Sequence, residues 1–246
     1  CLEPTAGDRA ATAGAPSRHP QDDAGPGYAA PVAVVLALLS SLLWGSADFL
    51  GGLTSRRRPA YAVVGGSQAC GLVVVTVVAV ATQAWTGPVS WIGWALLSGA
   101  CGTVGLVCFY SALGAGTMGV VSPIAALGAV VPVAAGMLAG ERPSVITTTG
   151  LLVALAGAVA ASGPEIRGSE AGTRPVALAA VAGVAFGLAL VFIERGARVD
   201  LVMTRVGMRV TSVAVFVVVA VAVGSIGGLG RRDVPVLAVA GAGDVG

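Results

Sequence analysis

The sequence predicts an all-α fold: a polytopic transmembrane helix bundle with inverted five-helix repeats, seven full spans and a truncated eighth. Three observations predict it. Hydrophobic residues make up 56% of the chain and charged residues only 11%, whereas a soluble domain carries roughly 25% charged residues. Apolar runs of about 20 residues, long enough to cross a bilayer, recur along the chain. A weak internal repeat relates the first part of the chain to the last.

The internal repeat has an offset of 142 residues. The segment Trp94–Gly102 aligns with Val236–Asp244, and the same offset pairs Trp44-Gly45 with Phe186-Gly187. Two copies of a unit with an odd number of crossings insert in opposite senses. We therefore expect a first repeat of five helices over residues 32–163 and a second over 176–246. The second is cut short, which predicts a parent protein of ten helices.

The elements follow from composition and run length. Residues 1–27 are rich in Pro, Gly, Ala and Asp without any period, which predicts a disordered N-terminal tail. Seven apolar runs then predict helices at 32–54, 60–82, 91–113, 117–139, 146–163, 176–194 and 202–226. An eighth helix begins near residue 234 and has only about 13 residues, too few to cross. The loops between the helices are short, which favours antiparallel neighbours.

Composition also excludes several functions. The net charge of +2 gives no indication of a nucleic-acid partner. The one histidine, His19, lies in the tail, and three cysteines (Cys70, Cys101 and Cys108) lie inside apolar runs as small packing residues. We expect no metal site and no cofactor. The predicted spans hold no HExxH motif, no paired aspartates and no serine beside a base, so we expect no catalytic residues and no enzyme.

An ordered set of short motifs carries a family resemblance. It consists of Leu43-Trp44-Gly45-Ser46, Phe109-Tyr110-Ser111-Ala112-Leu113, Val121-Ser122-Pro123-Ile124 and Gly140-Glu141-Arg142-Pro143. The set resembles the EamA domain of the drug/metabolite transporter superfamily. The resemblance implies two EamA domains, ten helices, and outward transport of small metabolites. It also implies a cavity between the repeats, lined by helices 1, 3 and 4 and their counterparts.

The resemblance and the repeat together favour an integral membrane secondary transporter. We expect it to move small metabolites or drug-like solutes out across the plasma membrane by alternating access. The chain has arginine but no lysine, as in GC-rich bacterial genomes, and the family resemblance implies an inner-membrane location. We therefore expect a multi-pass protein of the bacterial plasma (inner) membrane. Expected partners are a small-molecule substrate, the lipid bilayer and protons, and a homodimer is an option. A passive pore or a non-transporting membrane scaffold is the alternative.

Asp48 is the sharpest candidate for a functional residue. It lies roughly 9 Å inside the first predicted helix, and an ionisable group at that depth usually faces a cavity or a partner. Asp48 is expected to couple protons or contact a substrate amine; alternatively, it reaches Arg56–Arg58 at the interface. Trp44 lies one turn earlier on the same face. It forms an aromatic wall of the cavity or packs against a neighbouring helix.

Arg205 and Arg209 are also one turn apart. If their helix begins at Leu201, Arg209 lies roughly 12 Å inside it. If the helix begins at Val210, both arginines flank the membrane and extend to its surface, and the remaining apolar length favours this arrangement. Pairing of either arginine with Asp48 or Glu194 is a further hypothesis.

Three other residues complete the candidate substrate-binding or coupling set. Gln68 can hydrogen-bond solute, although a bond between helices is the favoured role. Tyr110 belongs to an aromatic belt or points its hydroxyl into the cavity. Pro123, like Pro132, interrupts the backbone hydrogen bonds of its helix, which either frees carbonyls for a ligand or kinks the helix. The pairs Gly136/Gly140 and Gly183/Gly187 are spaced for close helix contacts.

Overall fold

The computed structural model describes residues 26–116, 118–168, 172–225, 227–231 and 233–244. The chain divides between Ser41 and Leu42 into two units. The described part of the first unit is the beginning of α1, and the second unit holds the rest of α1 and all later helices. Residues 1–25 of the predicted tail lie outside the described residues. The last two residues of that predicted tail are helical, because α1 begins at Pro26.

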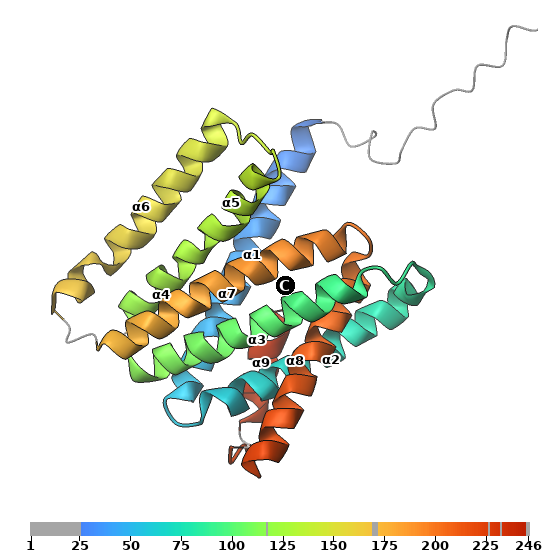
Figure 1. Ribbon diagram of the computed structural model, residues 1–246, viewed down its shortest axis with the longest axis vertical. Coiled ribbons are helices and arrows are strands. Elements are labelled where there is room, and N and C mark those ends of the chain that lie inside the picture. The colour runs from blue at the N-terminus through green and yellow to red at the C-terminus, as the bar shows by residue number, and fades with distance from the viewer. Residues whose placement is uncertain (1–25, 117, 169–171, 226, 232, 245–246) are drawn as a thin grey trace, which may run out of the picture. The chain divides into compact units, whose positions relative to one another are not determined.

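The described secondary structure is helical, and no strand occurs among the described residues (Figure 1). The elements are α1 (Pro26–Ser55), α2 (Ala60–Thr82), η1 (Ala84–Thr86), α3 (Ile92–Ala115), α4 (Met118–Ala126), η2 (Leu127–Ala129), α5 (Val130–Leu138), α6 (Val145–Gly168), α7 (Thr173–Ala197), α8 (Leu201–Val223) and α9 (Val234–Gly243). Each predicted span corresponds to a helix, or to the pair α4 and α5, and α9 is the predicted short eighth helix. The predicted polytopic helical bundle is confirmed, while the inverted relation of its two repeats stays a prediction.

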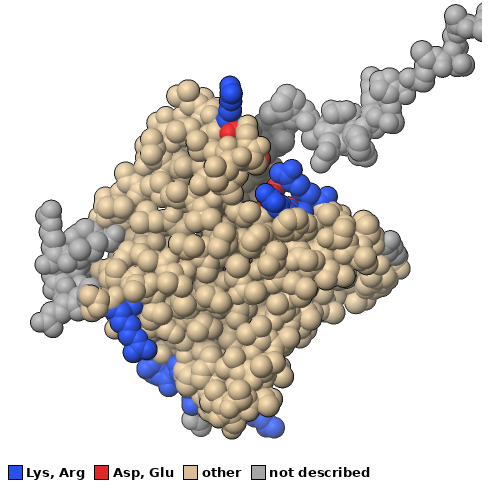
Figure 2. All heavy atoms as spheres, viewed as in Figure 1, with Lys and Arg blue, Asp and Glu red and all other residues tan. Residues whose placement is uncertain are grey.

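Within the described residues, six helical segments have the length and apolar character to cross a membrane: Pro31–Ser55, Ala60–Thr82, Ile92–Ala115, Met118–Leu138, Thr173–Ala197 and Leu201–Val223. Val145–Ala160 and Val234–Gly243 are shorter apolar helices. Large hydrophobic side chains remain exposed along these helices. On the face drawn in Figure 2, charged side chains lie at the margins and a broad area between them carries none. Lipid tails would cover such a surface without cost.

The start of α8 is fixed by a side-chain cap. The carboxylate of Asp200 accepts a hydrogen bond from the backbone N–H of Met203 at 2.8 Å, which satisfies one of the free donors of the first turn. The helix therefore begins at Leu201. The favoured prediction, a start at Val210, is wrong because the capping role of Asp200 outweighs the polar character of the first turns. Arg209 lies about 13 Å from Asp200 along the helix axis.

The helix predicted at 117–139 is divided into α4 and α5 by the short 3-10 helix η2. Pro132 has no N–H to donate to the carbonyl of Gly128, four residues earlier, and this favours the break. Pro123 lies inside α4, which continues past it. At the break, a Cβ on Gly128 would overlap the backbone of Gly183, and one on Gly187 would lie 2.5 Å from the carbonyl of Gly128. The two segments thus meet backbone to backbone, and the predicted close contact at Gly183/Gly187 is confirmed.

The second glycine pair behaves differently. Gly140 lies beyond the end of α5 with a φ of 91°, and a Cβ added there would meet open space. Gly136 lies instead against the carboxylate of Glu141, whose Oε2 would be 2.7 Å from an added Cβ. The expected helix contact at Gly136/Gly140 is wrong, since these glycines accommodate a helix end and the loop that follows.

The core lies where α3 packs against α7 and α8, and where α2 packs against α8 and α9 (Figure 1). The rings of Phe109 and Phe186 meet edge to face with their centroids 5.7 Å apart, a favoured geometry for aromatic pairs. Gly105 leaves room for the ring of Phe186. α6 packs against α4 and keeps most of its described side chains exposed. The polar interior described next therefore lies among the best-packed helices.

Candidate functional site

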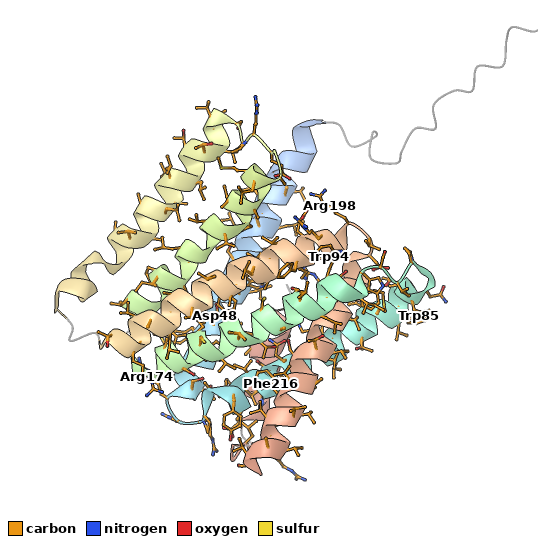
Figure 3. The ribbon with its side chains drawn as sticks, viewed as in Figure 1. Asp48, Trp85, Trp94, Arg174, Arg198 and Phe216 are labelled. Atoms are coloured by element: carbon orange, nitrogen blue, oxygen red, sulfur yellow. The ribbon has the colours of Figure 1, made fainter. Side chains whose placement is uncertain are left out.

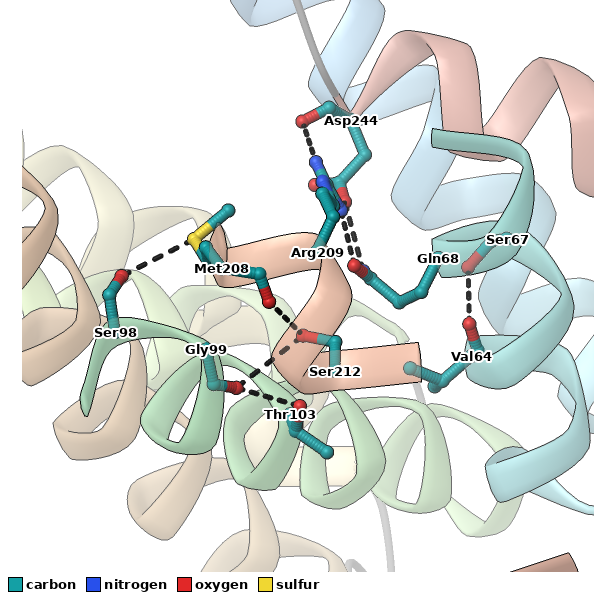
Figure 4. A network of polar contacts seen from close by, with 10 residues as sticks. All are labelled: Val64, Ser67, Gln68, Ser98, Gly99, Thr103, Met208, Arg209, Ser212 and Asp244. Atoms are coloured by element: carbon teal, nitrogen blue, oxygen red, sulfur yellow. Dashed lines mark hydrogen bonds and ion pairs between the residues drawn. The ribbon is translucent and has the colours of Figure 1, made fainter. Parts of the chain in front are cut away.

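Three side chains from α2, α8 and the end of α9 form a buried network, here called the ionic cluster: Gln68, Arg209 and Asp244 (Figure 4). Nη1 of Arg209 donates to Oε1 of Gln68 and to Oδ2 of Asp244, both at 2.5 Å. Nη2 donates to the backbone carbonyl of Asp244 at 2.7 Å. Nε2 of Gln68 donates to Oδ2 of Asp244 at 3.2 Å. The ionic cluster thus joins three helices through one guanidinium.

Burial differs among the members of the ionic cluster. Gln68 is 2% exposed and Arg209 is 3% exposed, whereas the side chain of Asp244 is 30% exposed. Removing a charge from water costs several kcal/mol unless it is well paired. Arg209 is paired, but its Nε is buried without a hydrogen-bond partner. The guanidinium therefore keeps one donor that its described neighbours do not satisfy.

Asp48 of α1 and Tyr110 of α3 border the ionic cluster. The carboxylates of Asp48 and Asp244 are close enough to interact electrostatically, and Tyr110 is within the same range of both and of Arg209. The backbone supports this arrangement at two glycines. Gly51, almost one turn after Asp48, lies against the ring and hydroxyl of Tyr110, and Gly243, next to Asp244, lies against α1 beside Ala47. Four helices thus bring ionisable groups to one place.

A second set of buried polar side chains, the hydroxyl cluster, lies on neighbouring turns of α3 and α8: Ser98, Thr103 and Ser212 (Figure 4). Ser98 donates to the carbonyl of Ala189 in α7 at 3.0 Å. Thr103 donates to the carbonyl of Gly99 at 2.7 Å. Ser212 donates to the carbonyl of Met208 at 3.1 Å and lies 3.4 Å from that of Gly99. The bond of Ser98 joins α3 to α7, whereas the shorter bonds of Thr103 and Ser212 stay within their own helices.

Charged and aromatic side chains also gather at the ends of the helices. Arg58, before α2, pairs with Asp233, before α9, at 3.1 Å. At the opposite end, Arg198 pairs with Glu194 at 2.6 Å. The hydrogen bond from Arg198 and the charge of Glu194 raise the pKa of that guanidinium above its usual value. These exposed pairs lie where membrane proteins place their interface residues.

The end of α7 that carries Arg198 also holds an aromatic contact. Trp94 stacks on Phe192 with ring centroids 6.3 Å apart, and the guanidinium of Arg195 lies 5.3 Å from the centre of the Trp94 ring. Figure 3 shows Arg174 and Arg198 at opposite ends of α7, with Trp94 near Arg198. The charged ends are thus separated by the length of a span.

The structure brings four of the candidate residues together: Asp48, Gln68, Tyr110 and Arg209. Trp44 is 45% exposed. Pro123 lies within α4, and Arg205 is partly buried one turn before Arg209. The roles proposed for all seven residues stay predictions.

One hypothesis about pairing needs correction, and the structure bears on a second. Arg209 pairs with Asp244 and not with Asp48 or Glu194, because Glu194 is bound by Arg198 at the far end of α7. For Asp48, one of the alternative partners Arg56–Arg58 is occupied, because Arg58 pairs with Asp233, and the alternative as a whole stays a prediction. Asp244 itself was missed as a site residue. Its only signal in the sequence is an acidic residue that directly follows an apolar run.

The apolar spans with ionisable groups in their interior define a multi-pass helical membrane protein. Residues 31–163, more than half of the chain, match the model of the EamA-like transporter family. The chain therefore belongs to the EamA-like transporter family, a family of membrane transporters. The predicted membership is confirmed, and the matched range coincides with the predicted first repeat.

One solved structure, described only as a crystal structure of a protein, is similar to the chain. It shares 20% sequence identity with a TM-score of 0.59, over 83% of this chain and 76% of that chain. At this identity the similarity shows the fold alone. Among curated proteins, none is similar enough to match the chain. Within the described residues, no group of three or more His, Cys, Asp or Glu side chains is placed to hold a metal ion.

Proposed function

We propose that this protein is a secondary transporter that moves small metabolites or drug-like solutes out across the bacterial plasma membrane by alternating access. One observation carries the proposal: the ionic cluster is buried among apolar helices and draws its members from both predicted repeats. Gln68 comes from the first repeat, and Arg209 and Asp244 come from the second. Charged groups inside a membrane bundle are costly and usually mark the path of a solute or ion.

The position of the Gln68–Arg209 hydrogen bond supports the proposal further. The two residues are 141 positions apart, one less than the offset of the internal repeat. They therefore occupy nearly equivalent places on the second helix of each predicted repeat, and these helices, α2 and α8, pack against each other. In an inverted repeat, a contact between equivalent positions lies near the pseudo-twofold axis. Transporters of this architecture bind solutes and coupling ions near that axis.

Asp48 is the proposed coupling residue. Its carboxylate interacts electrostatically with that of Asp244, and Tyr110 interacts with both carboxylates and with the guanidinium of Arg209. A proton on Asp48 removes the repulsion between the two carboxylates, and its release restores that repulsion. A rocking motion that separates α1 from α9 therefore changes the affinity of Asp48 for a proton. Such a difference in affinity is what allows a proton to bias one conformation over the other.

The test is flux in proteoliposomes made from the purified chain. The panel contains N-acetylphenylalanine as an anion, phenylalanine as a zwitterion and ethidium as a lipophilic cation, each with and without a pH gradient. We expect saturable flux of at least one probe that depends on the gradient and is lost in Asp48→Asn. Ser98→Ala, in the hydroxyl cluster, is the matched control. Flux that rises linearly with concentration would indicate a passive pore. The absence of flux for every probe would indicate a non-transporting scaffold.

A further inference from the structure

Two donors converge on one oxygen of Asp244. Oδ2 accepts hydrogen bonds from Nη1 of Arg209 at 2.5 Å and from Nε2 of Gln68 at 3.2 Å. A guanidinium and a side-chain amide together supply a positive charge and planar N–H groups, which is what a carboxylate needs from a binding site. Both donors are almost fully buried and lie on α2 and α8, which pack tightly together. The donor pair is thus pre-organised for a carboxylate.

The carboxylate that occupies this donor pair is more exposed than the donors. Asp244 directly follows α9, a helix of ten residues, and its side chain is 30% exposed. Asp244 is thus the member of the ionic cluster that water reaches most readily.

Arg209 also has unused capacity. Its Nε is buried without a partner, although Nε–H and the neighbouring Nη2–H together form a fork that fits the two oxygens of a carboxylate. Asp244 uses Nη1 and Nη2 and leaves this fork incomplete. An incoming carboxylate that takes Nε and Nη2 satisfies a donor that no described residue pairs, and it replaces the backbone carbonyl of Asp244 at Nη2.

We propose that Gln68 and Arg209 are the receptor for a carboxylate group on the solute, and that Asp244 is a tethered competitor that occupies this receptor in the unloaded protein. The proposal rests on the transport function proposed above and adds the chemical class of the solute, an organic molecule with a carboxylate. Arg209 is then the specificity-determining residue. Asp244 sets the affinity, because each solute molecule has to displace it.

Binding to the purified protein tests this inference without transport. The probes are lactate, phenylacetate and N-acetylphenylalanine, each compared with its neutral amide at millimolar concentrations, and the readout is the shift in the thermal unfolding temperature. Asp244→Asn keeps the shape of the competitor and removes its charge, so carboxylates should bind about tenfold more tightly. Arg209→Gln should abolish the difference between acid and amide. Arg209→Lys, which keeps the charge and loses the fork, should retain part of it. Ser98→Ala should match the wild type.

Two results would overturn the inference: equal binding of acids and amides in wild type and Asp244→Asn, or no binding of any carboxylate to Asp244→Asn. A structural role for Arg209 alone predicts lower stability in both charge variants and no gain of carboxylate affinity in Asp244→Asn. The two proposals fail separately. Saturable flux of ethidium alone would support the transport function and contradict a carboxylate solute. Carboxylate binding without saturable flux would support the carboxylate site and contradict the transport function.

Discussion

The ionic cluster and the hydroxyl cluster lie on adjoining faces of α8, yet they are built on opposite principles (Figure 4). Each hydroxyl of the second set donates to a backbone carbonyl, so its needs are met by the helices themselves. The ionic cluster joins side chain to side chain, carries charge, and leaves the Nε of Arg209 without a partner among the described residues. Burial alone therefore does not identify a binding site. A buried donor without a partner, next to an acceptor that a ligand can replace, identifies one.

The two clusters also differ in what their hydrogen bonds and ion pairs contribute to the stability of the fold. A hydroxyl bonded to a carbonyl between membrane helices contributes on average about 0.6 kcal/mol. A buried ion pair often contributes nothing net, because the desolvation of both charges offsets their attraction. The hydroxyl cluster can therefore be explained by stability. The ionic cluster needs another explanation, and solute binding supplies it.

The largest effect is expected from Arg209→Met. The substitution leaves the carboxylate of Asp244 and the amide of Gln68 without their main partner, and such losses cost about 3–5 kcal/mol in a buried pair. Thermal unfolding in detergent should show this destabilisation, with the exposed Arg198→Met as the control. An unchanged unfolding temperature would mean that the ionic cluster does not form in the membrane protein.

A double-mutant cycle sharpens the comparison. Arg209→Met combined with Asp244→Leu removes both charges, so the double variant should be more stable than the sum of the single losses predicts. The expected coupling energy is roughly 1–3 kcal/mol. Chemical unfolding of the four proteins measures it. Strictly additive losses would show that the two side chains do not pair.

A moderate effect is expected from Ser98→Ala. The substitution removes the hydrogen bond to Ala189 between α3 and α7, which should lower the free energy of unfolding by about 1 kcal/mol. Because the hydroxyl cluster serves packing, flux in proteoliposomes should stay at the wild-type level. Loss of flux in a variant that still folds would erase the distinction between the two clusters.

The smallest effect is expected from Ser212→Ala. Its better hydrogen bond goes to Met208 in its own helix, and its distance to Gly99 in α3 is 3.4 Å. A back-bond within one helix contributes little, so the change in the free energy of unfolding should stay within about 0.5 kcal/mol. A loss as large as that of Ser98→Ala would show that the contact with Gly99 is a strong one.

The sequence predicted the spans well because the length of an apolar run depends on neighbouring residues alone. The same local logic placed Pro132 where its helix breaks. The helix that packs against this break could not be identified in the same way. Gly183 of α7 belongs to one of two glycine pairs with the same spacing, and the other pair, Gly136 and Gly140, lies at a helix end. Spacing does not reveal which face of a helix meets a neighbour.

The candidate site was predicted in part for a related reason. Gln68, Asp48 and Arg209 stand out as polar residues in apolar surroundings, and a depth argument suffices to find them. The depth of Arg209 within its helix depends on where α8 begins, and the cap by Asp200 places that start at Leu201. Asp244 pairs with Arg209 across 35 residues, and no local pattern in one sequence indicates such a contact.

The most direct test of the account is an experimental structure of the protein with a transported solute bound. The account predicts density for the solute in the bundle interior beside Asp48, with Arg209 in hydrogen-bond contact with it and the side chain of Asp244 displaced. Density for the solute at another place, with Gln68, Arg209 and Asp244 still bonded to one another, would contradict it.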